Sequence, residues 1–230
     1  MVQSFPDDTP LYFENHQDDT AHIHATSVVE RPSRIGRNTR ILHFSCVMPH
    51  AIIGDNCHIG HHVTIASGVM VANAVHVSDN ALLNTGVILE DGVYCGASTV
   101  FTEEHRVRHN RGVSPVTPTL VRRGAHIGAN TTIASGATIG RYAFVEAGTV
   151  IDRNIPDFAV VYGNPLTLNG WQCQCGQPLV FSGRTGIAEC EACGQRYQQQ
   201  LEWKIIPVDA QTDAGVSRLT QEANRRDSDP

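Results

Sequence analysis

The segment Thr102–Leu120 is crowded with ionisable side chains, and the chemistry that it suggests is proton transfer. Histidine titrates near neutral pH, so His105 is a candidate general base. Glu103 or Glu104 could orient its imidazole and stabilise the charged form. A solvated loop histidine is the alternative for His105, and His109 is the second candidate base. Three arginines of the same segment either bind an anionic group or form a solvated run of charge: Arg106, Arg108 and Arg111.

Two close cysteine pairs form a second group with recognisable chemistry: Cys173 with Cys175, and Cys190 with Cys193. Four such residues suit a tetrahedral zinc site, although the first pair has one intervening residue rather than the usual two to four. A glycine follows the second cysteine of each pair and lets the chain curl tightly. Because all four positions are filled, the metal would be structural rather than catalytic. A ribbon without metal and a disulfide are the alternatives.

Composition limits the compartment and the partners. Seven cysteines without an export signal favour a reducing cytoplasm. The segment Met1–Phe5 lacks the charged and apolar regions of a signal peptide, and no stretch approaches a membrane span. The net charge of −6, from 17 basic and 23 acidic residues, argues against a nucleic-acid partner. We therefore expect a cytoplasmic protein without nucleic-acid or membrane partners, in which Cys46, Cys57 and Cys95 are small buried hydrophobic residues.

The elements that position these groups follow from a six-residue repeat. Four places after an apolar anchor the side chain is mostly small, and three places after it Asn or Gly recurs, residues that reach left-handed backbone angles at little cost. Each hexad is therefore a short strand followed by a corner, and three hexads form one triangular coil. The pattern predicts an all-β fold, a left-handed parallel β-helix of hexapeptide repeats over residues 23–165. Fourteen successive anchors are apolar: Ile23, Val29, Ile35, Ile41, Val47, Ile53, Ile59, Ile65, Val71, Val77, Leu83, Leu89, Cys95 and Phe101.

The repeat is interrupted once. After Phe101 it resumes at Val121, a step of twenty residues that is not a multiple of six. Residues 102–120 are therefore expected to leave the prism as an extruded loop, and long loops within compact folds are usually functional or disordered. Three further parts are expected: an N-terminal arm or cap over residues 1–22, a zinc-ribbon-like module over 166–205 and a disordered tail over 206–230.

Five segments give the chain a resemblance to a known family: LHFSCV (42–47), LEDGVYCGASTVFT (89–102), TLVRRGAHIGANTTIASGATIG (119–140), YAFVEAGTVIDRNIPDFAVVYGNP (142–165) and GW (170–171). In this order they resemble the hexapeptide-repeat N-acetyltransferases that acetylate the 3-amino group of UDP-2-acetamido-3-amino-2,3-dideoxyglucuronate. The resemblance implies a homotrimer in which each active site lies in the cleft between neighbouring prisms, with acetyl-CoA as co-substrate.

The resemblance also assigns roles to individual residues. Backbone around Ala134, Ala147 and Gly148 is implied as a rail for the pantetheine arm of acetyl-CoA. Arg153 is placed to meet the phosphates of the cofactor, and Asn164–Pro165 to close over its end. The structural alternative for Ala147 and Gly148 is a tight corner, and for Arg153 a solvated surface charge.

The loop residues acquire roles in the same way. The segment FTEEH at 101–105 resembles the corresponding loop of maltose- and galactoside-type acetyltransferases, in which a loop histidine is the base. This resemblance supports His105 as the base. Glu103 departs from the amino-sugar enzymes, where Asn is expected. Asn84 directly follows an anchor, faces outward, and either holds a substrate amine or hydroxyl or is a plain surface residue.

Together these patterns predict an acetyl-CoA-dependent N-acetyltransferase that acylates the amine of a nucleotide-linked amino sugar. Direct transfer is expected, since no cysteine is placed as a nucleophile. An O-acetyltransferase of the same fold is one alternative. Another is a metal-dependent hydratase similar to the carbonic anhydrases of this fold, which His61 and His62 suggest. A non-catalytic trimeric scaffold is the third.

Overall fold

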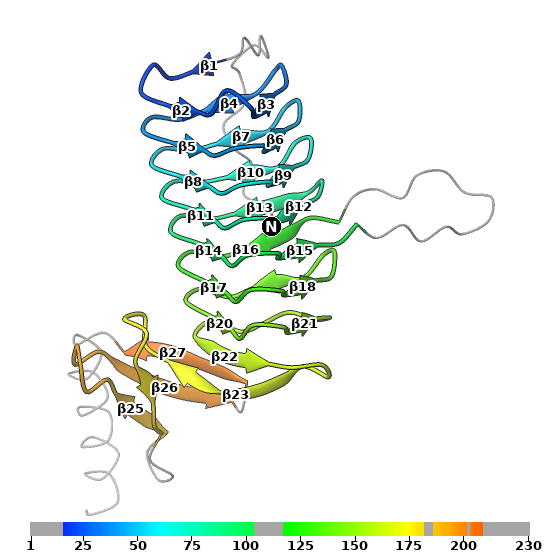
Figure 1. The fold of residues 1–230 in the computed structure, drawn as a ribbon. Helices are drawn as coiled ribbons and strands as arrows, with labels where there is room; N and C mark the ends of the chain where they lie inside the picture. Colours follow the sequence, from blue (N-terminus) through cyan, green and yellow to red (C-terminus); the bar gives the residue numbers. More distant parts are fainter. Residues whose placement is uncertain (1–15, 104–116, 182–185, 202, 209–230) are drawn as a thin grey trace, which may run out of the picture.

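The computed structural model describes residues 16–103, 117–181, 186–201 and 203–208. Within these ranges the chain forms strands and turns but no helix, and hence no helix long and apolar enough to cross a membrane. Most strands are two residues long and stack as successive coils of a prism, with a small sheet at its C-terminal end (Figure 1). The predicted all-β class, a left-handed β-helix of hexapeptide repeats, is confirmed.

Three parallel sheets, here named A, B and C, form the sides of the prism. Sheet A contains β1 (His16–Gln17), β4 (Arg34–Ile35), β7 (Ile52–Ile53), β10 (Met70–Val71), β13 (Val87–Leu89), β16 (Thr119–Val121) and β19 (Thr138–Ile139). Sheet B begins with β2 (His22–Ile23), β5 (Arg40–Ile41), β8 (His58–Ile59), β11 (His76–Val77), β14 (Tyr94–Cys95), β17 (His126–Ile127) and β20 (Phe144–Val145). Sheet C contains β3 (Val28–Val29), β6 (Cys46–Val47), β9 (Thr64–Ile65), β12 (Leu82–Leu83), β15 (Val100–Phe101), β18 (Thr132–Ile133) and β21 (Val150–Ile151).

The predicted anchors fill the inside of the prism. The second residue of a two-residue strand points inward, and from Ile35 to Ile151 these residues are almost fully buried. Ile23 and Val29 in the first coil are partly buried and pack against the same core. Burial of apolar surface in this continuous column is the main stabilising term of the fold.

The corners occur where the sequence predicts them. Asn38, Asn56 and Asn80, three places after their anchors, have φ between 55° and 58°. Bulkier residues occupy the same corner position in other coils and adopt the same backbone angle, for example Phe44 with φ 60° and Tyr142 with φ 53°. The position therefore requires the left-handed conformation whichever residue stands there.

The interruption leaves the register of the sheets intact. Strands in neighbouring coils pair at an offset of 18 residues, as Val71 does with Leu89. Across the interruption Leu89 pairs with Val121, 32 positions later, so 14 additional residues enter one coil without shifting the next. These residues leave the prism between β15 and β16. The described parts of the expected loop, Thr102–Glu103 and Thr117–Leu120, are its two ends.

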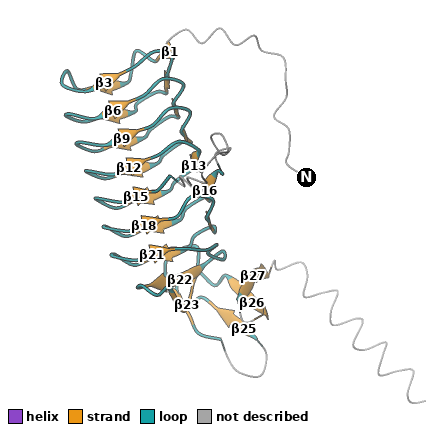
Figure 2. Ribbon diagram, turned by 90° about the vertical axis from the view of Figure 1, so that its right-hand side faces the viewer, coloured by secondary structure: helices purple, strands orange, loops and turns teal. Residues whose placement is uncertain are grey.

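The C-terminal end of the prism departs from the hexad pattern. Sheet B continues with β22 (Ala159–Tyr162), which pairs with β20 in parallel, and then with β23 (Thr167–Gln172) and β24 (Pro178–Leu179), which are antiparallel. A separate sheet D is formed by β25 (Ile187–Glu189), β26 (Arg196–Leu201) and β27 (Lys204–Val208). Figure 2 shows the stacked coils edge-on, with these strands at one end.

Both ends of the prism therefore extend beyond residues 23–165. The strand β1 already pairs with β4, so His16 and Gln17 belong to the first coil. At the other end β23 pairs with β22, so the segment that follows Pro165 begins as part of sheet B.

The three cysteines of the repeat do not share one environment. Cys57 and Cys95 are buried, as expected, but Cys46 is only half-buried, so its assignment to the core was wrong. Cys46 directly precedes the anchor Val47, and in a strand neighbouring side chains point to opposite faces. Its thiol therefore lies on the outer face of sheet C.

Candidate functional site

A groove of about 480 Å³ runs along the corner between sheets B and C, hereafter the B–C corner. One wall is the outer face of sheet B, and the floor is made of small corner residues. This volume lies in the range of small-molecule sites. Its lining residues are Ser78, Tyr94, Gly96, Ala97, His126, Gly128, Ala129, Phe144, Glu146 and Ala147.

The small side chains of the floor have a packing reason as well as a possible binding role. A Cβ atom on Gly128 would lie 2.4 Å from the backbone nitrogen of Ala147 in the next coil. The glycine is therefore required by coil stacking. The neighbouring residues Ala97, Ala129 and Ala147 keep the groove open. In the earlier coils of the same corner His43, His61 and Asp79 stand at the equivalent position.

The wall of the groove is part of a longer column of stacked rings, which the sequence patterns above do not predict. Its members come from the first residues of successive sheet B strands: His58, His76, Tyr94, His126 and Phe144. Neighbouring ring centroids lie 4.5–5.0 Å apart with interplanar angles of 13° or less. The signal was present in the sequence, because rings recur at the residue before every third anchor.

Two histidines of the column, His76 and His126, have a lowered pKa. Partial burial lowers the pKa of His76, and the neighbouring His58 lowers it further. Burial also lowers the pKa of His126, which lines the groove. Both imidazoles are consequently neutral at neutral pH.

Several predicted cofactor residues meet at this corner. Ala147 lines the groove, and Gly148, with φ 73°, forms the same turn. The hydroxyl of Thr149 accepts a hydrogen bond from the backbone N–H of Gly163 at 3.2 Å, so the exposed Asn164–Pro165 turn follows directly beside this corner. The structure therefore brings Ala147, Gly148 and Asn164–Pro165 to one end of the groove.

Ala134 and Arg153 lie elsewhere, at the corner between sheets C and A, hereafter the C–A corner. The backbone N–H of Ala134 donates to the carbonyl of Ile151, two residues before Arg153. Arg153 is exposed, and its Nε donates to Asp152 at 2.8 Å. This pair raises the pKa of Arg153 and lowers that of Asp152. Within one chain, therefore, the predicted cofactor residues lie at two corners that flank sheet C.

The two ends of the extruded loop lie at the C–A corner. The hydroxyl of Thr102 accepts a hydrogen bond from the backbone N–H of Ser135 at 3.3 Å, and Glu103 is exposed beside it. Asn84 is half-buried there, and its Nδ2 donates to the carbonyl of Phe101 at 2.8 Å. The structure thus brings Asn84 and Glu103 to the same corner as Ala134. The remaining loop candidates lie outside the described residues: His105, Glu104, Arg106, Arg108, His109 and Arg111.

The histidines that suggested a hydratase have other partners. His61 Nδ1 lies 3.0 Å from Asp79 Oδ1, and His62 stacks on Phe44 with centroids 5.1 Å apart. Among the described residues, the only group of three or more side chains with metal-ligand geometry is that of the four cysteines.

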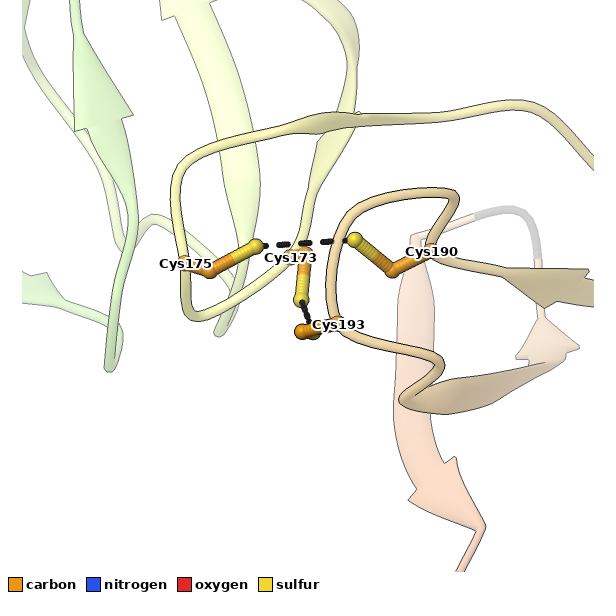
Figure 3. Close-up of side chains that lie close together, drawn as sticks. All are labelled: Cys173, Cys175, Cys190 and Cys193. Carbon is orange, nitrogen blue, oxygen red and sulfur yellow. Dashed lines mark hydrogen bonds between the residues drawn. The ribbon is translucent and has the colours of Figure 1, made fainter.

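The four cysteines converge as the sequence predicts (Figure 3). Their Sγ atoms all lie within 4.8 Å of one another, and two pairs, Cys173 with Cys193 and Cys175 with Cys190, are 3.5 Å apart. A tetrahedron with Zn–S bonds of about 2.3 Å has S–S edges of about 3.8 Å. The distances are too long for a disulfide. The donor set and its spacing therefore fit a zinc ion.

A backbone hydrogen bond closes a tight turn at each cysteine pair. The N–H of Gly176 donates to the carbonyl of Cys173, and the N–H of Gly194 to the carbonyl of Cys190, both at 2.8 Å. Both glycines have positive φ, 88° and 72°. Each pair therefore lies in a tight turn, and the single residue between Cys173 and Cys175 does not prevent it.

The solenoid matches known repeat models. The model described as "Bacterial transferase hexapeptide (six repeats)" matches residues 32–67 and 118–153, and "Hexapeptide repeat of succinyl-transferase" matches residues 50–100. Both matches lie within the described coils, and the second ends where the extruded loop is about to begin. They identify the prism as a hexapeptide-repeat β-helix.

Individual relatives are similar over shorter segments. The chain is 46% identical over 80 residues to the dTDP-3-amino-3,6-dideoxy-alpha-D-galactopyranose 3-N-acetyltransferase of Aneurinibacillus thermoaerophilus, which covers 35% of this chain and 40% of that protein. It is 31% identical over 80 residues to the bifunctional protein GlmU of Brevibacillus brevis, covering 34% of this chain and 16% of GlmU. The chain thus spans less than half the length of these relatives.

A solved structure supports the fold. LpxA from Bacteroides fragilis, a UDP-N-acetylglucosamine acyltransferase, superposes with a TM-score of 0.54 at 19% identity, covering 66% of this chain and 61% of LpxA. At this identity the likeness concerns the β-helix alone.

The ring column makes the stability of the protein sensitive to acid. The unfolded chain takes up a proton at His76 near pH 6.5, whereas the folded chain does so only at lower pH. The contribution of His76 to the free energy of unfolding is therefore fully present above about pH 6.5. It is lost as the pH falls from this value through the lowered pKa of the folded state. We expect His76→Phe, which keeps a stacking ring, to show a smaller fall in Tm between about pH 7.5 and about pH 5.5 than the unmodified protein.

The matched control is His22→Phe, at an exposed histidine in the same register position of β2. This variant should retain the full acid dependence, measured by thermal unfolding over the same range. Equal falls in Tm for the two variants would count against the role of the column.

Proposed function

We propose that the chain is an acetyl-CoA-dependent N-acetyltransferase that acts on the amine of a nucleotide-linked amino sugar. The observation that carries the proposal is the 46% identity over 80 residues to an N-acetyltransferase of a dTDP-linked 3-amino sugar. The hexapeptide-repeat matches and the open groove support it. Because the matched segment is a part of that relative, the nucleotide and the sugar are parts of the proposal.

The groove suits an extended cofactor. A pantetheine arm is narrow and has amide groups, and the alanine floor at Ala97, Ala129 and Ala147 lets such an arm approach the backbone of successive coils. The rings of Tyr94, His126 and Phe144 give the same groove an apolar wall. Asn164–Pro165, at the end of the groove nearest the last coils, is proposed to close over the cofactor.

A homotrimer is the second part of the proposal. Asn84, Glu103, Ala134 and Arg153 lie at the C–A corner, and Ala147 lies at the B–C corner on the other side of sheet C. A neighbouring subunit that places its C–A corner against this groove would bring the two sets of residues together. We propose that the active site is such an inter-subunit cleft, with Arg153 exchanging Asp152 for a phosphate of the cofactor.

In the proposed reaction the neutral amine of the sugar attacks the thioester carbonyl carbon. The new C–N bond forms as the C–S bond breaks, and the amine proton passes to a general base, for which we propose His105. Coenzyme A leaves as its thiolate, which takes the proton from the base and departs as the thiol. Glu103 is proposed to orient that imidazole, and Asn84 to hold the amine. Direct transfer is supported by the burial of Cys95, which raises the pKa of its thiol to about 12 and leaves it unsuited to nucleophilic attack.

The remaining parts of the proposal concern metal and compartment. We propose that Cys173, Cys175, Cys190 and Cys193 hold a structural zinc ion, on the strength of their geometry and of the fit to tetrahedral thiolate ligation. A cytoplasmic location is proposed because the cysteines within the described residues are free thiols rather than disulfides.

The activity is tested with a panel of dTDP- and UDP-linked amino sugars offered together with acetyl-CoA. We expect thiol release with at least one 3-amino sugar and none with the corresponding hydroxyl sugar. Carbon dioxide hydration should be absent. Release with the hydroxyl sugar instead would indicate an O-acetyltransferase, and no release with any acceptor would overturn the proposal.

The proposed base is tested by His105→Ala. Because a positioned general base contributes about 10²- to 10⁴-fold, we expect kcat to fall by that factor while the Kd for acetyl-CoA stays unchanged. His109→Ala is the matched control, from the same segment, and should keep most of the turnover. Near-normal kcat in the His105 variant would refute the assignment.

The groove is tested by Ala147→Leu. A leucine side chain at this position occupies the space left for the cofactor, and we expect coenzyme A to bind about tenfold more weakly, equal to about 1.4 kcal/mol. Ala74→Leu, at an exposed corner between sheets A and B, is the matched control. Calorimetric titration with coenzyme A measures both, and equal affinities would place the cofactor elsewhere.

A further inference from the structure

The C-terminal end of the prism presents a structural problem. Sheet C ends at β21, whereas sheet B is extended by β22, β23 and β24. The unpaired edge of a sheet exposes backbone groups and is a site of fraying and unwanted pairing. Because β23 is antiparallel to β22, it closes sheet B against further coils. The pairing is irregular, with a register shift between Val160 and Val161, so β23 needs support from other contacts.

Contacts at one end of β23 supply part of that support. Trp171 is buried, with 8% of its surface exposed. Gln172 donates from its backbone N–H to the carbonyl of Phe158 at 2.9 Å and from Nε2 to the carbonyl of Tyr142 at 2.8 Å. The next residue along the chain is Cys173, the first of the four cysteines. The cysteine cluster therefore begins directly after Gln172, the residue that hydrogen-bonds β23 to the last coil.

A chain of aromatic contacts joins the cluster to the prism. The Tyr197 hydroxyl accepts a hydrogen bond from the backbone N–H of Gln174 at 3.0 Å and lies 3.2 Å from Cys173 Sγ, to which it can donate. The fully buried Tyr197 ring meets Phe158 edge-on at 5.1 Å, and Phe158 stacks on Tyr142 at 5.7 Å. Tyr197 thus touches both a cysteine ligand and the last coil.

Within the described residues, no strand of sheet D pairs with a strand of sheet B. Cys173 and Cys175 follow β23 of sheet B, whereas Cys190 and Cys193 lie between β25 and β26 of sheet D. Two sulfur pairs at 3.5 Å, Cys173 with Cys193 and Cys175 with Cys190, each join one sheet's segment to the other's, as Figure 3 shows. A metal bound by all four would therefore be a cross-link between the two sheets.

We infer that the zinc ion proposed above is a clamp that closes the C-terminal end of the β-helix. The same clamp holds the groove wall in place at its C-terminal end, where Phe144 lies. The clamp fixes the turn after β23, β23 pairs with β22, and β22 pairs with β20, which carries Phe144 of the groove. Only two strand pairings separate the metal from the groove. The inference rests on the zinc part of the proposed function and goes beyond it by assigning the metal a task.

The test compares amide hydrogen exchange of the full-length protein with zinc bound and after removal by a chelator. We expect about one zinc per chain, measured by elemental mass spectrometry. On removal, exchange in β20, β22, β23 and β26 should accelerate by about tenfold or more, because local opening becomes easier. Exchange in β7 and β10, several coils away, should stay unchanged, and added zinc should restore the slow rates.

Three variants sharpen the test. Tyr197→Phe removes the hydroxyl beside Cys173 Sγ and should weaken zinc binding by about tenfold, as loss of a partner of a metal ligand does. Cys46→Ser, at a half-buried thiol in an early coil, is the control and should leave zinc content and exchange unchanged. Cys193→Ser should reproduce the stripped protein, and if it fails to fold, the chelator comparison decides.

The outcomes separate the inference from the proposals on which it rests. Protein without zinc, and without uptake of added zinc, would overturn both the metal site and the clamp. Zinc at about one per chain with unchanged exchange in β20, β22, β23 and β26 would overturn the clamp and leave the site. Lack of acetyltransferase activity would count against the proposed enzyme but not against the clamp, since the exchange experiment needs no substrate.

Discussion

The fold depends on the hydrogen bonding of each short strand to the strand one coil away. Two-residue strands have little stability alone, and each is held by the strands of the neighbouring coils and by its inward anchor. Because the pairing offset is 18 residues, equivalent positions in successive coils lie directly over one another. Any residue type that recurs at this offset becomes a line on the surface. The ring column on sheet B and the alanine floor beside it are both such lines.

The sequence was sufficient to predict the inside of the prism. Anchors such as Ile59 and Ile133 have one environment, and only apolar residues suit it, so their period is visible without a structure. Outward positions carry no comparable constraint. Cys46 was misplaced for this reason, and the stacked rings were missed because their period is three hexads rather than one.

The candidate site was predictable only in part. The four cysteines were found because metal ligation restricts both residue type and spacing, and the structure brings their sulfur atoms together. Ala147, which the resemblance assigns to the cofactor, lines the groove. The resemblance groups Ala134 and Ala147 as one cofactor rail, but they differ by 13 positions in a coil of 18 and therefore lie at different corners of the triangle.

The offset of 32 residues across the interruption has a consequence for how such a protein can change. The 14 extra residues enter and leave at one corner, so the coils on either side are identical in register to those of an uninterrupted prism. In a linear stack of this kind, stability is a sum of contacts between neighbouring coils. A segment that makes no coil of its own can then be lengthened, shortened or rewritten independently of the scaffold. The proposed general base and the scaffold are then encoded in separate stretches of the same chain.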